Sequence, residues 1–420
     1  MYKTKILENG LTIIGEEIPY LKSITLGIWI NAGSRIEEAQ VSGISHFIEH
    51  MMFKGTKNRT SKEIASSIDN LGGQINAFTS NAFTSKECTC YYVKLIDEHI
   101  DTGIDVLSDM ILNSKFDKND IDKERLIILE ELKMYEDSPD DLSYDLLVEN
   151  IYANDGLGMN IIGTKESLYN ITRESMLEYL NKYYIPNNAV ISIAGNFNFD
   201  DMVEKIKSKF GHWEKKNLSI DISEAKFNPC FISKNKDTEQ VNLAMCLKGI
   251  PFENDEEVYS MAVVNNIFGG SISSRLFQKI REEKGLVYSI YSSQTLYRKC
   301  GELGIFASMS TENLQDVYNL IKKEIENIRE NYLTEKEISE SKEQLKGNYI
   351  LDLESTSSRM MSTGKSMLLS KKVKTTDEIL ECINNVNINS IKKVVDKVFN
   401  IENIGTCIVG RDVEKILHLD

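Results

Sequence analysis

Apolar and polar positions alternate along this chain in an order that is repeated in its two halves. In the first half, LTIIGEEI and SITLGIWINAG (residues 23–33) predict strands, and a helical pattern begins near residue 42. In the second half, QVNLAMCLKGI (residues 240–250) predicts a strand. DEEVYSMAVVNNIFGG, which follows it, predicts a helix with an acidic first turn and a Gly-Gly stop.

The two halves also end alike. NNAVISIAGNF (residues 187–197) predicts a buried strand, and FDDMVEKIKSKF predicts the helix after it. NIGTCIVGRD (residues 403–412) predicts a second buried strand, which VEKIL follows. A repeat of about 200 residues favours a duplicated domain over a short-repeat solenoid. Long helices without strict strand–helix alternation favour an α+β fold with mainly antiparallel sheets.

We therefore expect two similar α+β domains, each a mainly antiparallel sheet packed with helices. The first should span residues 1–212 and the second residues 240–420. Residues 213–239 are polar and carry Pro229, so they predict a linker with some extended structure.

Composition narrows the classes of function. The chain has 420 residues, of which 41% are hydrophobic and 27% charged, as in ordinary soluble proteins. Its 49 basic and 64 acidic residues give a net charge of −15, which argues against nucleic-acid binding and permits cationic peptides as ligands. No stretch has the length of a signal peptide's apolar core or of a membrane helix, and the seven cysteines are scattered. We expect a cytoplasmic protein with free thiols and no membrane partner.

The segment GISHFIEHMMFKGT (residues 43–56) carries the sharpest chemical signal. His46 and His50 are four residues apart, so on a helix they lie one turn apart on one face. Two imidazoles in this arrangement can bind one Zn²⁺. Glu49 lies beside them, where it would polarise water rather than act as a ligand. This H-x-x-E-H order is that of the inverzincins, and only five histidines occur in the whole chain.

A catalytic zinc site needs a third protein ligand, which we expect in KERLIILEELKMYED (residues 123–137). Glu124, Glu130 and Glu131 compete for this role. Seven residues are nearly two helical turns, so Glu124 and Glu131 share a face, while Glu130 is turned by about 100°. Glu131 as the ligand, with Glu124 as a hydrogen-bonding partner of a ligand, fits this geometry.

These motifs resemble those of the M16 family of zinc peptidases, which includes pitrilysin, insulin-degrading enzyme and the mitochondrial processing peptidase. The resemblance covers both halves of the chain, and its length and layout are similar to the bacterial processing-peptidase branch. It implies one Zn²⁺ per chain, with the second glutamate of the EE pair, Glu131, as the third ligand. The motifs that carry it are NAGSRIE, HFIEHMMFKGT, LGGQINAFTS, ERLIILEELKMYEDSPDD and SSRLFQKIREEKGLVYSIYSS.

The segment IREEKGLVY contains Arg281 and Tyr288, which the residues alone would make a surface arginine and a half-buried tyrosine. The resemblance implies that the two approach the substrate and the oxyanion that develops on its carbonyl, a role that suits a cation and a phenol. In larger relatives the pair lies on the half opposite the zinc half. We therefore expect a homodimer that forms a clamshell chamber, in which Arg281 and Tyr288 of one subunit face the zinc of the other.

The sequence NAFTS occurs twice in succession, at residues 76–80 and 81–85. The resemblance implies a single NAFT, on an edge strand that pairs with an extended peptide substrate. Without five residues, the 81-residue gap from His50 to Glu131 becomes 76, close to the family's spacing. An in-line insertion of five would invert later side chains, so we expect a bulge or a longer turn.

Asn76, Ala77 and Phe78 of the first copy follow Gly72 and Gly73 at the customary distance, so we favour them as substrate-binding residues. The second copy keeps the customary distance to the residues after it, Lys86 and Glu87, and stays open.

The sequence thus predicts a zinc-dependent endopeptidase that cleaves peptides or unfolded, presequence-like segments. His46, His50 and Glu131 hold the metal, and Glu49 takes a proton from water and passes it to the leaving amine. Arg281 and Tyr288 stabilise the oxyanion. The alternative is a non-catalytic or partner-dependent subunit of an M16-type complex, with activity impaired by the NAFTS duplication.

Overall fold

A computed structural model describes residues 2–75 and 82–413, which divide into two units. Unit 1 consists of Met1–Leu132, Met159–Asp221 and Ile350–Thr375. Unit 2 consists of Lys133–Gly158, Ile222–Tyr349 and Thr376–Asp420. The domains expected from the sequence, 1–212 and 240–420 with 213–239 between them, were each continuous, whereas both units combine separate stretches of the chain.

The sheet of unit 1 runs in the order β1-β2-β7-β3-β6-β4, and β5 also pairs with β6. Only the pairing of β2 with β7 is parallel. Every residue of β7 is buried, as its apolar sequence AVISIAG predicts for a central strand. The strands are β1 Tyr2–Ile6, β2 Thr12–Glu17, β3 Ser23–Ile30, β4 Gln74–Ile75, β5 Ala82–Thr84, β6 Thr89–Ile96 and β7 Ala189–Gly195.

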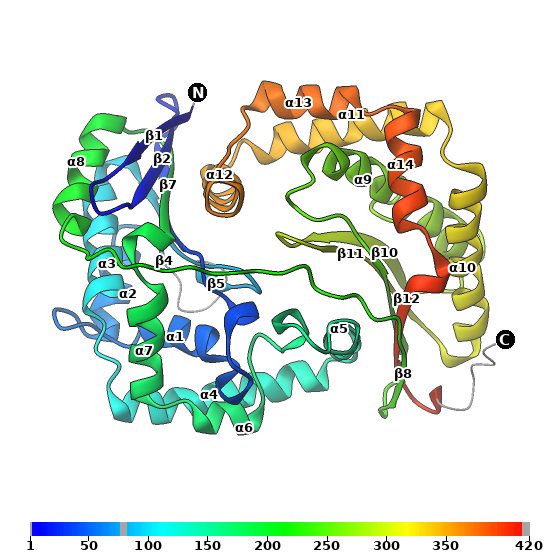
Figure 1. The fold of residues 1–420 in the computed structure, drawn as a ribbon, viewed down its shortest axis with the longest axis horizontal. Coiled ribbons are helices and arrows are strands. Elements are labelled where there is room, and N and C mark those ends of the chain that lie inside the picture. The colour runs from blue at the N-terminus through cyan, green and yellow to red at the C-terminus, as the bar shows by residue number, and fades with distance from the viewer. Residues whose placement is uncertain (1, 76–81, 414–420) are drawn as a thin grey trace. The chain divides into compact units, whose positions relative to one another are not determined.

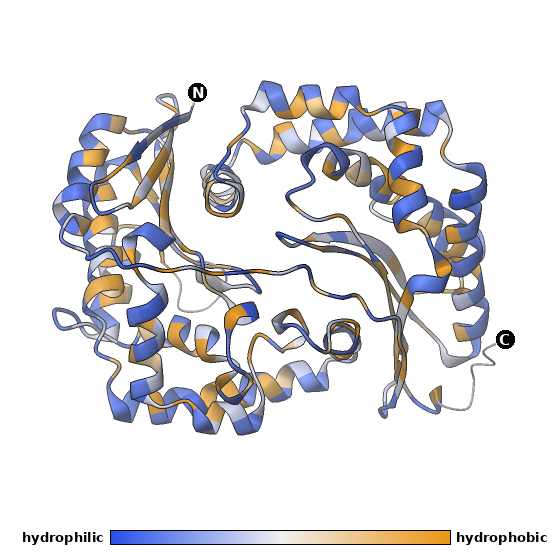
Figure 2. Ribbon diagram, in the orientation of Figure 1, coloured by the Kyte–Doolittle hydropathy of each residue, from blue (hydrophilic) through white to orange (hydrophobic). Residues whose placement is uncertain are grey.

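The helices of unit 1 form where apolar residues recur every three or four positions behind a capping residue. In α8, Asn198 caps the first turn, and Phe199, Met202, Val203 and Ile206 are buried, so hydrophobic and hydrophilic residues alternate along it (Figure 2). The helices are α1 Ile44–Met52, α2 Ser61–Asp69, α3 Ile100–Asn113, α4 Lys118–Asp137, whose last turn belongs to unit 2, α6 Lys165–Asn170, α7 Arg173–Tyr183, α8 Phe199–Phe210 and α12 Thr356–Ser370.

The sheet of unit 2 runs in the order β10-β11-β9-β12-β8, and only β12 and β8 are parallel. Its strands are β8 Phe231–Asn235, β9 Val241–Lys248, β10 Ser289–Leu296, β11 Gly301–Met309 and β12 Ile404–Gly410. Strand β8 therefore lies within the stretch expected to be a linker. The residues VEKIL, expected to follow the last strand, lie mostly outside the described residues.

A large core lies between the unit 2 sheet and its helices, with Phe268, Ile321, Val394 and Ile408 fully buried in it. The helices are α5 Pro139–Ile151, α9 Asp255–Phe268, α10 Leu314–Asn331, α11 Glu335–Asp352, whose last residues belong to unit 1, α13 Thr376–Asn385 and α14 Ile388–Val398. A π-helix, Phe277–Glu282, lies between α9 and β10.

The two sheets share one topology. In chain order, the five strands β2, β3, β4, β6 and β7 lie in the same order across the sheet as β8, β9, β10, β11 and β12. In both sheets the parallel pair joins the first and last of these strands. The predicted fold class, two similar α+β domains with mainly antiparallel sheets, is confirmed.

Each unit contains a helix from the other half of the chain (Figure 1). Helix α5, from the first half, packs Leu147 and Ile151 beside Cys246 and Cys407 of the unit 2 sheet. Helix α12, from the second half, packs on β7 and β3 of unit 1. Its contact includes buried hydroxyl pairs. The Oγ1 atoms of Thr356 and Thr25 are 2.8 Å apart, and the hydroxyl oxygens of Thr363 and Ser192 are 2.7 Å apart.

All seven cysteines lie in the described residues, and none forms a disulfide. Among the helices of the described residues, none combines the length and the apolar character that a bilayer crossing requires.

Candidate metal centre

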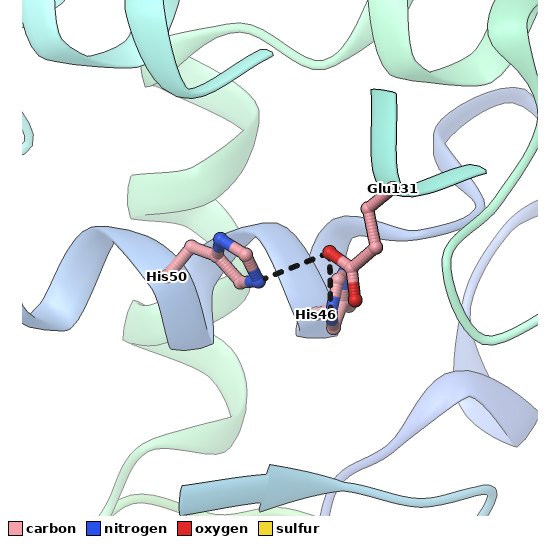
Figure 3. Close-up of side chains that lie close together, drawn as sticks. All are labelled: His46, His50 and Glu131. Atoms are coloured by element: carbon pink, nitrogen blue, oxygen red, sulfur yellow. Dashed lines mark ion pairs between the residues drawn. The ribbon is translucent and has the colours of Figure 1, made fainter. Parts of the chain in front are cut away.

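Helix α1 brings His46 and His50 together, as the spacing of the H-x-x-E-H segment predicts. Ile44, Phe47 and Ile48 are buried against the core of unit 1 and fix the rotation of the helix. The two imidazole centroids are 4.5 Å apart, with an interplanar angle of 63° (Figure 3). Both Nε2 atoms approach the same carboxylate, that of Glu131 on α4.

Glu131 completes a group of three possible metal ligands. Its Oε2 lies 3.7 Å from Nε2 of His46 and 3.5 Å from Nε2 of His50. One ligand atom from each of the three residues lies within 4.8 Å of the others. Ligands bound tetrahedrally at 2.0–2.1 Å are about 3.3 Å apart. The two distances from Glu131 to the histidines are thus within a few tenths of an ångström of those that a zinc ion requires, and the three residues fit such an ion.

The three glutamates of α4 differ in their positions relative to the two histidines. Glu130 is exposed and is not part of the group of possible ligands. Glu124 is only 4% exposed, and its Oε1 lies 2.9 Å from Nδ1 of His50. Lys54 Nζ lies 2.6 Å from the other oxygen of Glu124. Glu124 is thus placed to fix the orientation of His50 and, with it, the nitrogen that faces Glu131.

The two histidines differ in their electrostatic environment. Burial, and to a smaller extent the neighbouring His50, lower the pKa of His46 to about 3, so His46 is neutral near pH 7. Burial also lowers the pKa of His50, but the hydrogen bond to Glu124 and the charge of Glu131 outweigh it, and the net shift is upward. A neutral imidazole is the form that binds a metal, and His46 is in that form.

Glu49 lies on α1 next to His50. Burial raises the pKa of Glu49, against the opposing effect of a hydrogen bond from Thr84. Thr84 Oγ1 donates this bond to Oε2 at 2.7 Å. The carboxylate is therefore held in one orientation, and its affinity for a proton is above that of an ordinary glutamate, as a general base at neutral pH requires.

Two short strands on either side of the duplicated NAFTS segment pair with β6. Gln74 and Ile75 of β4 pair with Lys94 and Val93 of β6. Ala82 of β5 pairs with Tyr91, two positions further along β6. Six residues of the sequence separate Ile75 from Ala82, whereas a single residue of β6, Tyr92, separates their partners, so the sequence has five residues more than a continuous strand needs. The expected bulge or longer turn would lie among residues 76–81, which are outside the described residues, and it stays a prediction.

The favoured substrate residues Asn76, Ala77 and Phe78 lie outside the described residues. The described edge strand β5, Ala82–Thr84, comes from the second copy of NAFTS.

Arg281 and Tyr288 belong to unit 2, whereas the group of possible metal ligands belongs to unit 1. Arg281 lies in the π-helix, with its guanidinium 4.7 Å from the centroid of Phe277. Helices of this type often occur at functional sites. Tyr288 is 72% exposed, rather than half-buried as the residues alone suggested, so both side chains are accessible.

The sequence assigned no role to Glu37, Lys54 or Thr84, although all three contact the candidate site. Lys54 follows His50 by four residues, a spacing that could have indicated the same face. Glu37 and Thr84 reach α1 from outside the helix, and no local pattern predicts such contacts.

Two sequence models of one family match the chain, one in each half. That described as Insulinase (Peptidase family M16) covers residues 12–165, and that described as Peptidase M16 inactive domain covers residues 170–345. The uncharacterized zinc protease YmxG of Bacillus subtilis is 42% identical over 399 residues, which are 95% of this chain and 96% of that protein. An uncharacterized zinc protease of Rickettsia felis is 36% identical over 397 residues, 94% of each chain.

Solved structures share the fold at lower identity. A protease from Helicobacter pylori superposes with a TM-score of 0.89 at 20% identity, over 97% of this chain and 99% of that one. A peptidase M16 inactive domain from Pseudomonas fluorescens gives a TM-score of 0.91 at 17% identity, over 98% of both chains. The fold is that of these solved structures, and the sequence relatives are named zinc proteases. The chain belongs to peptidase family M16.

Proposed function

We propose that the protein is a zinc-dependent endopeptidase that cleaves peptides or unfolded, presequence-like segments. The grouping of His46, His50 and Glu131, with Glu49 on the same helix as both histidines, carries this proposal. Three protein ligands leave one position of a tetrahedral zinc site open, which is typical of catalytic rather than structural sites. A zinc ion held there supplies Lewis acidity, which polarises a carbonyl oxygen and makes water more acidic.

Glu49 is the proposed proton carrier. Its raised pKa favours uptake of a proton from the attacking water, and the same carboxyl group then returns the proton to the leaving amine. The hydrogen bond from Thr84 to Oε2 favours one orientation of the carboxylate for both transfers. Glu124 does not bind the metal in this proposal. Its hydrogen bond to Nδ1 of His50 keeps Nε2 of that ring turned toward Glu131, and Lys54 holds the Glu124 carboxylate in place.

The proposed peptide site is the edge of the unit 1 sheet next to β6. Within the described residues, β5 pairs only with β6, which leaves its other edge for an added strand. A peptide bound in this way is recognised mainly through its main chain, so little sequence preference is expected. The side chain of Thr84 on β5 reaches Glu49, so a strand added here would pass close to the proposed proton carrier. Asn76–Phe78 remain a prediction.

We also propose that the working form is a homodimer in which Arg281 and Tyr288 of one subunit face the metal centre of the other. Their exposure on unit 2 supports this role, because side chains that serve a partner's site must be free to approach it. A guanidinium and a phenol would donate hydrogen bonds to a developing oxyanion.

The competing function is that of a non-catalytic or partner-dependent subunit. The five extra residues favour it, because they immediately precede the strand that holds Glu49 through Thr84. A structure named as an inactive domain among those with the same fold also permits it.

Peptide cleavage by the purified chain, with and without a chelator and with products identified by mass, separates the two functions. An active peptidase should lose cleavage with the chelator and regain it with zinc. Glu49→Gln should bind zinc as the wild type does and lose cleavage by several orders of magnitude, because the amide cannot carry the proton. A wild type that binds zinc without cleaving any peptide would favour the subunit role.

A further inference from the structure

The first turn of α1 is fastened by a carboxylate from outside the helix. Oε2 of Glu37 accepts a hydrogen bond from the backbone N–H of Gly43 at 2.7 Å. Oε1 accepts one from the backbone N–H of Ser45 at 2.8 Å. Glu37 is only 9% exposed, and no side chain of α1's own capping residue performs this role. Ser45 is fixed a second time, since its Oγ lies 2.7 Å from the hydroxyl oxygen of Tyr179.

His46 follows Ser45 directly, and its ring lacks the kind of support that His50 has. Nδ1 of His50 is hydrogen-bonded to Glu124. Nδ1 of His46 is buried, and within the described residues it has no hydrogen-bond partner. A histidine that binds a metal is usually oriented by a hydrogen bond at its other ring nitrogen. The position of His46 must therefore come from the backbone that carries it and from the packing around it.

We propose that Glu37 is a positioning residue for metal binding, which places His46 through the backbone of the first helical turn as Glu124 places His50 through its side chain. The inference rests on the proposed metal site, but it does not depend on peptide cleavage. Glu37 is not a ligand, and it acts only through Gly43 and Ser45.

Burial raises the pKa of Glu37 to about 7, against the hydrogen bonds from Ser45 and Gly43, so the carboxyl group is partly ionised near neutral pH. In its ionised form, the charge of Glu37 acts in the same direction as its geometry. The N-terminus of a helix carries a partial positive charge of roughly half a unit, concentrated on its free N–H groups. A cation bound at His46, in the first turn, would be repelled by it. A carboxylate that binds two of these N–H groups offsets that field at the position where the metal ligand stands.

Removing the carboxylate should therefore weaken zinc binding beyond any loss of fold stability. Glu37→Ala removes both acceptors and the charge, whereas Glu37→Gln keeps one acceptor and loses the charge. Thr60→Ala is the matched control. It removes the cap of α2, a helix of nine residues like α1 in the same unit, which carries none of the candidate ligands.

Zinc affinity is measured by competition with a chromophoric chelator, and the geometry of the site by the visible absorption of the Co²⁺-loaded chain. We expect Glu37→Ala to weaken zinc binding by about 10- to 100-fold, the usual effect of losing a supporting group. The cobalt spectrum of Glu37→Ala should also change. The zinc affinity of Glu37→Gln should lie between those of Glu37→Ala and the wild type, and that of Thr60→Ala should stay within about twofold of the wild type.

Zinc affinity of Glu37→Ala equal to that of Thr60→Ala, with an unchanged cobalt spectrum, would overturn the inference. If Glu37→Ala does not fold, Glu37→Gln decides by the same comparison. If the wild type binds zinc and cleaves peptides while the Glu37 variants bind zinc normally, the role of Glu37 is refuted and the proposed peptidase stands. Weakened binding in the variants with no cleavage by any form supports the inference and refutes the proposed peptidase.

Discussion

Deleting one copy of NAFTS should stabilise unit 1 and keep the edge strand beside β6. The two copies are identical, so removal of residues 76–80 or 81–85 yields the same chain. In that chain one asparagine would separate Ile75 from the Ala-Phe-Thr strand. It would stand opposite Tyr92, the single residue of β6 between the partners of Ile75 and Ala82. Strands β4 and β5 would then become one continuous strand.

The size of the effect follows from the six residues that now connect two fixed points. Closing a segment of six residues costs about 1.6 kcal/mol more than closing one of a single residue, from a dependence of (3/2)RT ln n. One further backbone hydrogen bond would contribute about 0.5–1 kcal/mol. The deletion should therefore raise the free energy of unfolding by about 2 kcal/mol. For a unit of this size, that corresponds to a melting temperature higher by about 4–8 °C.

Calorimetry of the metal-free chain measures this change. Replacing residues 76–80 with an equally long Gly-Ser segment is the control, and it should melt close to the wild type because the segment length is unchanged. Peptide cleavage should persist in the deletion, because Thr84 would remain on the strand paired with β6 and could still donate its hydrogen bond to Glu49. A deletion chain that melts at or below the wild-type temperature would refute the register argument.

Two further predictions concern stability. Gly364→Ala should destabilise the protein by about 1–3 kcal/mol, because the new Cβ would meet Nε1 of Trp29 at 2.0 Å. Gly347→Ala, whose new Cβ would have nothing within 4 Å, should stabilise it by about 0.5–1 kcal/mol. Chemical denaturation of both variants measures these opposite signs, and equal effects would contradict the packing. Burial raises the pKa of Glu337, but hydrogen bonds, chiefly from Arg275, outweigh it and hold that pKa at about 2. A carboxyl group with a lowered pKa stabilises the fold above pH 4.5, and this stabilisation is lost as the pH falls toward 2. For Glu337 it amounts to at most about 3 kcal/mol, and the partial exposure of the side chain reduces that figure. Denaturation at pH 7 and pH 3 should therefore show a smaller loss for Glu337→Gln than for the wild type, and parallel losses would contradict the assignment.

The possible metal ligands were predictable because their chemistry is encoded locally. The four-residue spacing of His46 and His50 determines that they share a helix face, whatever surrounds the helix. Helical geometry likewise favoured Glu131 and Glu124 over Glu130 on α4, before any contact between α1 and α4 was known. Central strands such as β7 were equally clear, because a run of buried residues has few alternatives.

Contacts between distant segments were not predictable. Glu37 binds the start of α1 from a preceding 3₁₀ turn, and no pattern in NAGSRIE indicates where that carboxylate points. The choice between the two NAFTS copies depended on spacing alone, which favoured the first, whereas the described pairing with β6 uses the second. Helices α5 and α12 have ordinary amphipathic or polar sequences, and nothing in them shows that each packs on the sheet of the other half.

The exchange of α5 and α12 has a consequence for how the chain folds as it is synthesised. The buried hydroxyl groups of Thr25 and Ser192 find partners on α12, Thr25 at Thr356 and Ser357, and Ser192 at Thr363 and the carbonyl of Met360. These residues leave the ribosome more than 160 residues later. Until then one face of the first sheet lacks its covering helix, and unpaired buried polar groups disfavour a closed core. Long-range closure of this kind slows folding and prolongs exposure of apolar surface. The first half of the chain should therefore depend on the second half, or on a chaperone that shields the sheet, to reach its native state.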